Sequence, residues 1–208
     1  MKLILRFFTL FSLFVLSACG AWTSVSSVKG PAYKGQIYHK IMIEGRGRTP
    51  KETLDIEWSF RNVLQSPALQ VLASTDLFPV TETFTEEEKK IKINTEKIEA
   101  VLIVSFKDRQ LQHNYQPPDT TTTTVKNKEG KTEVKTQSSG GYNYYTEYNY
   151  HDILMIDAAD SKPIWSASAS TQADPNDFWS PSDKEQDFLS SLAKKTRKKL
   201  IKDALIQE

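Results

Sequence analysis

The only cysteine of this chain lies at the end of an apolar leader, and that position limits how the protein can fold. Lys2 and Arg6 precede or flank a nearly uninterrupted apolar stretch, which ends in Leu-Ser-Ala-Cys at residues 16–19. A positive start, an apolar stretch and small residues before a cleavage point are typical of a secretory leader. The branched residue, the two small residues and the cysteine together match the lipobox of bacterial lipoproteins. Acylation of Cys19 would leave no thiol for a disulfide, so the fold must depend on its apolar core.

The leader predicts a mature chain that begins at Cys19, after removal of residues 1–18, and that acyl chains on this cysteine hold in a lipid bilayer. An ordinary secretory leader that happens to contain a cysteine is the alternative. Gly20 stands where an Asp would retain a lipoprotein in the inner membrane. In a Gram-negative envelope we therefore expect a lipid-anchored protein of the outer membrane that faces the periplasm. Residues 19–36 are mostly small and polar, which predicts a flexible tether.

The charge balance of the chain excludes one class of partner. The sequence carries 27 basic and 26 acidic residues, and two of the basic ones, Lys2 and Arg6, lie in the leader. The mature chain is therefore close to neutral, and no overall field draws it to nucleic acid. Apolar residues make up 38% and aromatic residues 11% of the sequence, enough to fill the core of one α/β domain over residues 37–208.

Strand and helix signals alternate along the first half of this domain. Strands are indicated by β-branched or apolar runs, and helix starts by Thr or Ser placed before Pro or Glu. The expected strands are residues 37–43, 77–84 and 99–106, and the expected helices begin at Thr49, at Ser66 (ending near Leu72) and at Thr85 (ending near Asn94). The stretch 99–106 is continuously apolar, as in a strand buried within a sheet.

The stretch 117–141 is polar and has almost no large apolar residue. It contains five consecutive threonines at residues 120–124. Such a stretch cannot bury enough surface to offset the entropy that it loses on ordering. We therefore expect a long, mobile hairpin or loop here.

The remaining elements follow this hairpin. Residues 153–157 and 163–170 predict two strands joined by a turn. From about Ser180 the spacing predicts an amphipathic helix whose apolar stripe includes Leu192 and Leu200. Together the elements predict an α/β (α+β) fold: a mixed β-sheet with helices packed on it, a long polar hairpin between the middle strands and a C-terminal amphipathic helix.

Two segments resemble parts of known envelope proteins. Residues 98–106 are similar to a buried strand, and residues 153–168 to a strand–turn–strand motif, of several small envelope lipoprotein families. These are uncharacterised outer-membrane lipoproteins, the penicillin-binding-protein activator lipoproteins and the curli-secretion lipoprotein. The resemblance implies an α/β fold in a small outer-membrane lipoprotein, and it implies no catalytic residue. This chain has Ala-Ala-Asp-Ser at 158–161 in place of the usual Thr-Gly turn.

The chemistry-bearing residues form no recognisable catalytic or metal-binding pattern. The three histidines, His39, His113 and His151, lack the spacing of a metal site. Asp157, at a strand end, is interpreted as a turn cap, although catalytic acids also occur at strand ends. Residues 45–48, Gly-Arg-Gly-Arg, could contact phosphate or lipid headgroups, but a basic turn is the favoured interpretation. We therefore expect no catalytic residue, no metal and no cofactor.

Four tyrosines alternate along the chain after the hairpin. Tyr142, Tyr144, Tyr148 and Tyr150 fall on one strand face, with Thr146 between them. Such a stripe can stack on a sugar ligand or contact a partner protein. Packing of the tyrosines across a hairpin is the favoured alternative. The lysine-rich face of the last helix could similarly meet anionic lipid, and a solvated face is favoured there.

Three hypotheses about function follow. The favoured one is a non-enzymatic envelope lipoprotein, anchored through acylated Cys19, that acts as an accessory or adaptor in cell-envelope assembly or maintenance and binds a protein partner there. The second is a subunit of an outer-membrane secretion or assembly complex, although residues 120–139 lack the alternating apolar residues of a membrane-crossing strand. The third is an envelope hydrolase whose site is assembled from distant residues.

Overall fold

The computed structural model describes residues 21–79, 81–126, 131–172 and 181–207. The expected leader and Cys19 lie outside the described residues. The elements are β1 (Trp22–Lys29), β2 (Lys40–Arg46), α2 (Pro50–Leu64), β3 (Gln70–Ala73), α3 (Ser74–Leu77), α4 (Glu86–Thr95), β4 (Ala100–Gln116), β5 (Thr120–Lys126), β6 (Thr132–Ser138), β7 (Tyr142–Asp157), β8 (Pro163–Gln172) and α5 (Pro181–Lys202).

A mixed six-stranded sheet forms the centre of the molecule, which confirms the expected fold class. Its strand order is β1-β8-β7-β4-β2-β3, and β5 pairs only with β6 in a separate two-stranded sheet. Strand β2 is parallel to β3 and β4, whereas the pairs β4–β7, β7–β8 and β1–β8 are antiparallel. The parallel strands are joined through helices, and the antiparallel strands β7 and β8 through a short turn.

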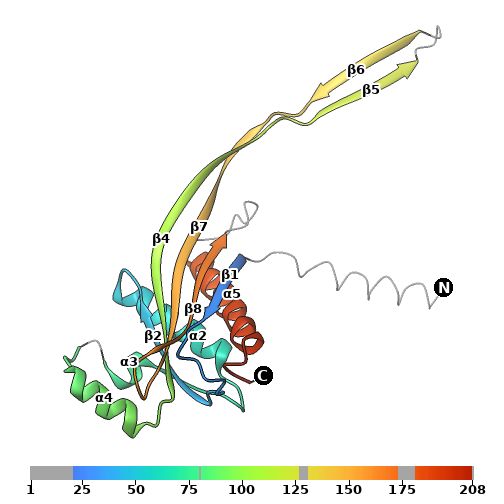
Figure 1. The fold of residues 1–208 in the computed structure, drawn as a ribbon. Coiled ribbons are helices and arrows are strands. Elements are labelled where there is room, and N and C mark those ends of the chain that lie inside the picture. Colours follow the sequence, from blue (N-terminus) through green and yellow to red (C-terminus); the bar gives the residue numbers. More distant parts are fainter. Residues whose placement is uncertain (1–20, 80, 127–130, 173–180, 208) are drawn as a thin grey trace, which may run out of the picture.

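The main core lies between the sheet and the two long helices, α2 and α5 (Figure 1). Helix α2 contributes Ile56, Phe60 and Leu64, each almost fully buried. On the opposite face of the sheet a smaller apolar cluster includes Val101 and Ile103 and is lined by α3 and α4. Helix α4 buries none of its side chains. The two faces of the sheet are therefore covered unequally, closely by α2 and α5 and loosely by α4.

The helix starts expected at Thr49 and Thr85 are confirmed. The Thr49 side chain accepts a hydrogen bond from the Glu52 amide, and Pro50 occupies the first helical turn. Thr85 and Glu88 form a capping box at the start of α4. In α5 the buried side chains fall on one stripe, which consists of Phe188, Leu189, Leu192, Ala193, Thr196 and Leu200.

The expected flexible tether over residues 19–36 is wrong for the part that forms β1. Residues 22–29 pair with β8 along its whole length, from Trp22 opposite Gln172 to Lys29 opposite Trp165. The small polar residues here fit closely against α5. The Thr23 hydroxyl is buried and lies 2.7 Å from the Ser191 hydroxyl. A polar composition therefore hid a strand whose buried positions are filled by small hydroxyl side chains.

Two elements expected between residues 66 and 84 are also wrong. Ser66 and Leu69 form a tight bridge instead of a helical turn, and the strand β3 begins directly after it. Its register is set by Val71, which is buried and whose amide donates to the Gln65 side chain. The expected strand over 77–84 is absent from the described residues of that stretch, since α3 ends at Leu77. Apolar content alone did not distinguish core-filling loop residues from a strand.

The strands at the centre of the sheet are longer than expected. The expected strand 99–106 is the first part of β4, which continues to Gln116, and the expected strand 153–157 is the last part of β7, which begins at Tyr142. Within residues 117–141, β5 pairs with β6 as in the expected hairpin, and residues 127–130 lie outside the described residues. The extra length of β4 and β7 creates the most prominent feature of the molecule.

Candidate partner-binding arm

A two-stranded arm projects from one end of the sheet (Figure 1). Strand β8 accompanies β7 only as far as Tyr148, which lies opposite Gln172. Beyond that point, among the described residues, β4 and β7 pair only with each other, up to Gln116 opposite Tyr142. We call residues 111–116, residues 142–147 and the β5–β6 hairpin the ribbon arm. At about 3.3 Å per residue, its two paired segments add up to roughly 40 Å of extended chain.

A β-bulge at Lys107 sets which side chains share a face of this arm. Phe106 lies opposite His151 and Asp108 lies opposite Tyr150, so β4 contains one more residue than β7 at this point. The extra residue shifts the alternation of β4 by one position. As a result, the odd-numbered residues of β4 beyond the bulge lie on the same face as the odd-numbered residues of β7.

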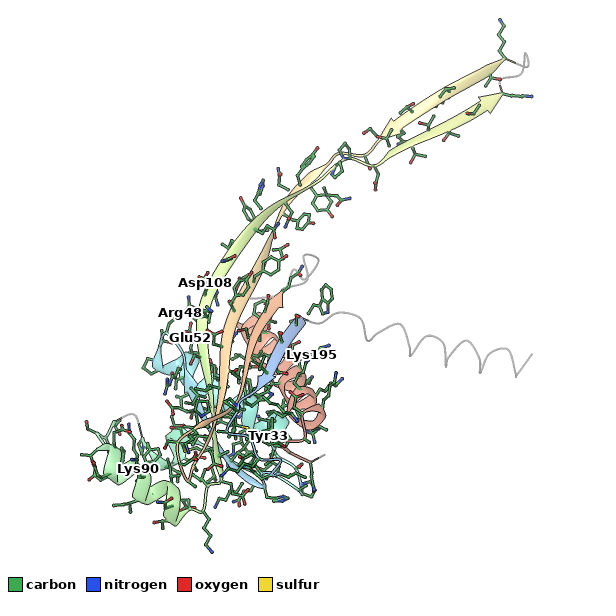
Figure 2. The ribbon with its side chains drawn as sticks, in the orientation of Figure 1. Tyr33, Arg48, Glu52, Lys90, Asp108 and Lys195 are labelled. Carbon is green, nitrogen blue, oxygen red and sulfur yellow. The ribbon has the colours of Figure 1, made fainter. Side chains whose placement is uncertain are left out.

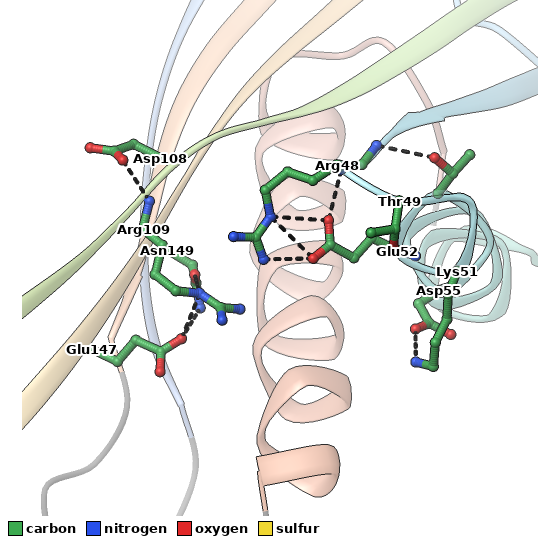
Figure 3. Close-up of polar contacts among 11 residues, drawn as sticks. Arg48, Thr49, Lys51, Glu52, Asp55, Asp108, Arg109, Glu147 and Asn149 are labelled. Atoms are coloured by element: carbon green, nitrogen blue, oxygen red, sulfur yellow. Dashed lines mark hydrogen bonds and ion pairs between the residues drawn. The ribbon is translucent and has the colours of Figure 1, made fainter.

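Polar contacts hold the root of the arm against the domain (Figure 3). The Arg109 guanidinium donates to the Asn149 side chain at 3.0 Å and forms an ion pair with Glu147 at 3.0 Å. Arg48, at the start of α2, pairs with Glu52 at 2.6 Å. Its guanidinium also lies 4.4 Å from the centre of the Phe106 ring. The contact between Arg48 and Phe106 connects the start of α2 to β4, whereas the contacts of Arg109 join β4 to β7.

The Gly-Arg-Gly-Arg segment leads from β2 into α2: Gly45 and Arg46 are the last residues of β2, and only Gly47 and Arg48 lie in the turn that was expected for all four residues. A Cβ on Gly45 would lie 2.6 Å from the Thr53 carbonyl oxygen, and one on Gly47 would lie 2.5 Å from the Glu52 Cβ. Glycine is therefore required where the helix passes close to the strand. Arg46 pairs with Glu44 at 2.7 Å, and Arg48 pairs with Glu52. Both arginines already have acidic partners, so this turn is a poor phosphate site.

His151 is buried at the base of the arm. Its side chain is 4% exposed, its ring contacts Phe106 edge-to-face, and its Nδ1 atom has no hydrogen-bond partner. Burial lowers the pKa of His151 to about 4, against a smaller opposing effect of the Glu52 and Asp152 carboxylates. The imidazole is therefore neutral at physiological pH and acts as a packing residue.

The four tyrosines occupy alternate positions on one face, which we call the tyrosine face. Tyr142 and Tyr144 have ring centres 5.9 Å apart, and Tyr148 stacks on Tyr150 at 6.5 Å. Thr146, between the two pairs, is buried and accepts a hydrogen bond from Asn114. The rings pack along the strand and still leave Tyr142 56% exposed. Their contact with a ligand or partner stays a prediction.

The sequence interpretation missed a second set of large side chains on the opposite face of the arm. Leu111, Tyr115 and Tyr145 are each exposed by more than 60%, and His113 packs against Tyr145 at 5.1 Å. We call these four residues the mixed face. The alternation of Leu111, His113 and Tyr115 was visible in the sequence. It was overlooked because the intervening residues are polar, which resembles the end of a strand.

The other candidate residues have structural roles. Asp157 accepts hydrogen bonds from the Ala159 amide and the Tyr38 hydroxyl, which confirms its interpretation as a turn cap. Burial of Tyr38, followed by the charge of Asp157, raises the pKa of the Tyr38 hydroxyl. In the part of the chain that the structure describes, no group of three or more His, Cys, Asp or Glu side chains is placed to hold a metal ion. The histidines His39, His113 and His151 belong to different parts of the fold: the approach to β2, the arm and its root.

A large pocket beside α4 gives the hydrolase hypothesis no support. It has a volume of about 620 Å³, lies between the sheet and α4, and has no histidine among its lining residues. Its buried acid, Glu57, accepts hydrogen bonds from the Gly45 amide and from both the amide and hydroxyl of Thr75. This carboxyl group is thus engaged in joining α2 to β2 and α3.

Among the helices of the described residues, none is both long and apolar enough to cross a membrane.

Comparisons with known proteins assign this chain to no family. No family model matches the chain, and no curated protein matches it. The chain is similar to a solved PelC dodecamer from Paraburkholderia phytofirmans, with 11% identity and a TM-score of 0.45, and to a variant of it with 12% identity and a TM-score of 0.46. Both alignments cover 83% of this chain and 96% of the other. A PDZ domain protein from Parabacteroides distasonis is similar at 10% identity and a TM-score of 0.35, over 88% of this chain and 38% of that one. We therefore base the function on this chain's own residues.

Proposed function

We propose that this chain is a non-enzymatic, lipid-anchored protein of the outer membrane that binds a protein partner through its ribbon arm, as an accessory or adaptor in cell-envelope assembly or maintenance. The ribbon arm is the observation that carries the proposal. It extends beyond the packed domain and presents large side chains on both faces. Acylation of Cys19, which the leader indicates, would keep this arm close to the membrane.

The physical properties of the arm support a binding role. A two-stranded ribbon has no third strand or helix to cover it, and such ribbons are marginally stable in water on their own. Both of its edges carry unpaired backbone groups, which can accept an additional strand from a partner. The exposed Leu111, Tyr115 and Tyr145 would bury a large apolar area on contact, and aromatic side chains of this kind dominate protein interfaces.

The position of the anchor favours the second candidate, a subunit of a secretion or assembly complex. Trp22, at the start of β1, lies level with Gln172, which in turn lies opposite Tyr148 at the base of the arm. The arm therefore leaves the sheet at the same end at which the chain approaches Cys19. A partner that contacts the arm would consequently lie at the membrane that holds the anchor.

The outer part of the arm supports a contact with protein rather than with lipid tails. Strands β5 and β6 are each seven residues long and consist mostly of threonine, serine and charged or amide residues. Val125 and Val134 are their only large apolar residues. A strand that crosses a membrane presents an apolar side chain at every second position. The polar composition of β5 and β6 fits a contact with a hydrated protein surface.

A capture experiment from envelope membranes tests this proposal. The full-length tagged protein is cross-linked in cells and purified beside three variants. The first replaces residues 117–141 with Asn-Gly, the second carries Leu111→Ser, Tyr115→Ser and Tyr145→Ser, and the third carries Trp58→Ser. Trp58, on α2, is 58% exposed and lies off the arm, so it is the matched control for loss of an exposed aromatic.

We expect one or both arm variants to lose the cross-linked partner while the Trp58→Ser protein keeps it. Retention of the partner by both arm variants would place the interaction elsewhere. Expression of a second, differently tagged copy of the protein in the same cells separates the adaptor from the complex subunit, because only a self-assembling subunit would copurify with itself.

Metabolic labelling with a palmitate analogue tests the anchor independently. Label on a Cys19→Ser protein would refute acylation at that residue.

A further inference from the structure

A basic groove runs along the edge of the sheet beside the predicted anchor. One side of the groove is the start of β1, residues 22–25. The other side consists of four lysines of α5, namely Lys195, Lys198, Lys199 and Lys202. The groove has a volume of about 360 Å³. We call these eight residues the basic flank. Figure 2 shows Lys195 on α5 beside β1, far from Lys90 on α4.

The charges of the basic flank are largely unneutralised. Lys195, Lys198 and Lys202 are exposed and form no ion pair within the described residues. Asp203, just after the end of α5, accepts hydrogen bonds from Trp165 and Ser27 and also feels the charge of Lys199. Spacings of three and four residues place these lysines on one side of α5, so their charges add.

Trp22 adds an apolar group at the anchor end of the flank. Its side chain is 74% exposed, the most exposed large apolar side chain among the described residues. It follows Cys19 by three residues, which can span at most about 11 Å. An acyl group on Cys19 would therefore bring the indole to the membrane surface. Tryptophan is enriched at that depth, because its ring is apolar and its N–H group is polar.

We propose that the basic flank rests on the anionic lipid headgroups of the membrane that holds Cys19. This proposal deepens the proposed function, since it relies on the same anchor. The lysine ammonium groups bind the phosphate groups of the lipids, and the Trp22 ring enters the interfacial layer. The membrane is the occupant that fits, because one end of the groove begins within three residues of the acylated cysteine. The contact would fix how the domain lies on the membrane, which a single flexible anchor would leave free.

Vesicle binding by the unacylated chain tests this contact. Residues 19–208 with Cys19→Ser are mixed with vesicles of phosphatidylethanolamine and phosphatidylglycerol, or with neutral vesicles of phosphatidylethanolamine and phosphatidylcholine. The test variant carries Lys195→Glu, Lys198→Glu and Lys202→Glu. The control variant carries the same charge change at Lys34, Lys90 and Lys97, three exposed lysines that lie away from the flank.

We expect the unacylated chain to bind the anionic vesicles and to bind the neutral ones little. On anionic vesicles the partition coefficient of the flank variant should be at least about 100-fold lower, because each lysine contributes roughly 1 kcal/mol at an anionic surface. The control variant should bind within a few-fold of the starting chain. Equal binding of the two variants, or no preference for anionic vesicles, would overturn the proposal.

Tryptophan fluorescence gives a second readout that does not depend on charge. We expect the emission to shift to shorter wavelength on anionic vesicles, and Trp22→Phe to remove most of that shift. An unchanged shift in Trp22→Phe would show that another part of the chain contacts the lipid. The palmitate label on the wild-type protein shows which proposal fails. Label without vesicle binding would refute only the lipid contact of the basic flank, whereas vesicle binding without label would refute only the acyl anchor on Cys19.

Discussion

Glu57 joins three elements through one buried carboxyl group. It lies on α2, is 2% exposed, and accepts hydrogen bonds from the Gly45 amide in β2 and from Thr75 in α3. Burial raises the pKa of this carboxyl, and the hydrogen bonds from Thr75 and Gly45 oppose that effect. The group therefore acts as a hydrogen-bond acceptor for backbone groups that would otherwise be buried without partners.

Replacing Glu57 should destabilise the domain according to the number of donors left unpaired. We expect Glu57→Leu to lower the free energy of unfolding by about 3 kcal/mol, because the Gly45 and Thr75 amides lose their acceptor. Glu57→Gln should cost less, since its one remaining oxygen can still accept from Thr75. Urea unfolding at neutral pH measures both, with the exposed Glu87→Gln as the control. Equal stability of Glu57→Leu and the control would contradict this role.

His151 should make stability depend on pH in a defined window. Its pKa is about 4 in the folded protein and 6.5 in the unfolded chain, so the unfolded chain binds more protons between these values. The free energy of unfolding therefore falls as the pH drops through this window, by about 2 kcal/mol between pH 7 and pH 5. Urea unfolding at both pH values checks this. The loss should be about 2 kcal/mol smaller in His151→Leu.

The difference between the two proteins isolates His151 from other titrating groups. Glu57, whose pKa is raised, acts in the opposite direction, because the folded protein takes up its proton first as the pH falls. That contribution is present in both proteins and cancels. The same pH dependence in His151→Leu as in the wild type would mean that the imidazole is not buried in its neutral form.

At the scale of elements, α5 closes the main core. Leu192, near its middle, is fully buried and packs in the cluster beneath the helix. We expect Leu192→Ala to lower the free energy of unfolding by about 2–5 kcal/mol, the usual cost of a cavity at such a site. Thermal unfolding followed by circular dichroism measures it. Lys194→Ala, two residues away on the exposed side, should change the melting temperature little.

The sequence predicted elements that have a local signal, such as a periodic apolar stripe or a helix cap. It missed elements whose contacts are made by small or polar side chains. The stripe of α5 and the caps at Thr49 and Thr85 are local signals, and they were confirmed. Strand β1 was missed because its buried positions include Thr23, whose hydroxyl is satisfied by residues far along the chain. No local pattern reveals such a partner.

The length of β4 could not be read from its composition for a related reason. Beyond Phe106 almost every side chain is polar, and the strand persists because β7 pairs with it residue by residue. The bulge at Lys107 also shifts the alternation, so a period of two counted from Ala100 assigns the later residues to the wrong face. The tyrosine face was predicted because β7 has no such interruption, whereas the mixed face was not.

At the scale of the whole molecule, the outer hairpin of the ribbon arm should be dispensable for folding. We expect the protein in which Asn-Gly replaces residues 117–141 to keep its melting temperature within about 4 °C, which corresponds to about 1 kcal/mol for a chain of this size. Gln116 and Tyr142 lie directly opposite each other, and Asn-Gly is the preferred two-residue connection between such strands. Differential scanning calorimetry measures the transition. A fall of more than 10 °C would show that the hairpin stabilises the domain.

The pairing of β1 with β8 also determines when the sheet can finish folding. Trp22 pairs with Gln172, so the first described strand depends on one of the last, and contacts between such distant residues form slowly. The leader predicts export, and in an exported chain β1 has no strand to join until β8 has emerged. Under that prediction β1 would stay unpaired until most of the chain has been exported. Enzymes that acylate and cleave a predicted lipoprotein would have that interval in which to act, before β1 pairs with β8.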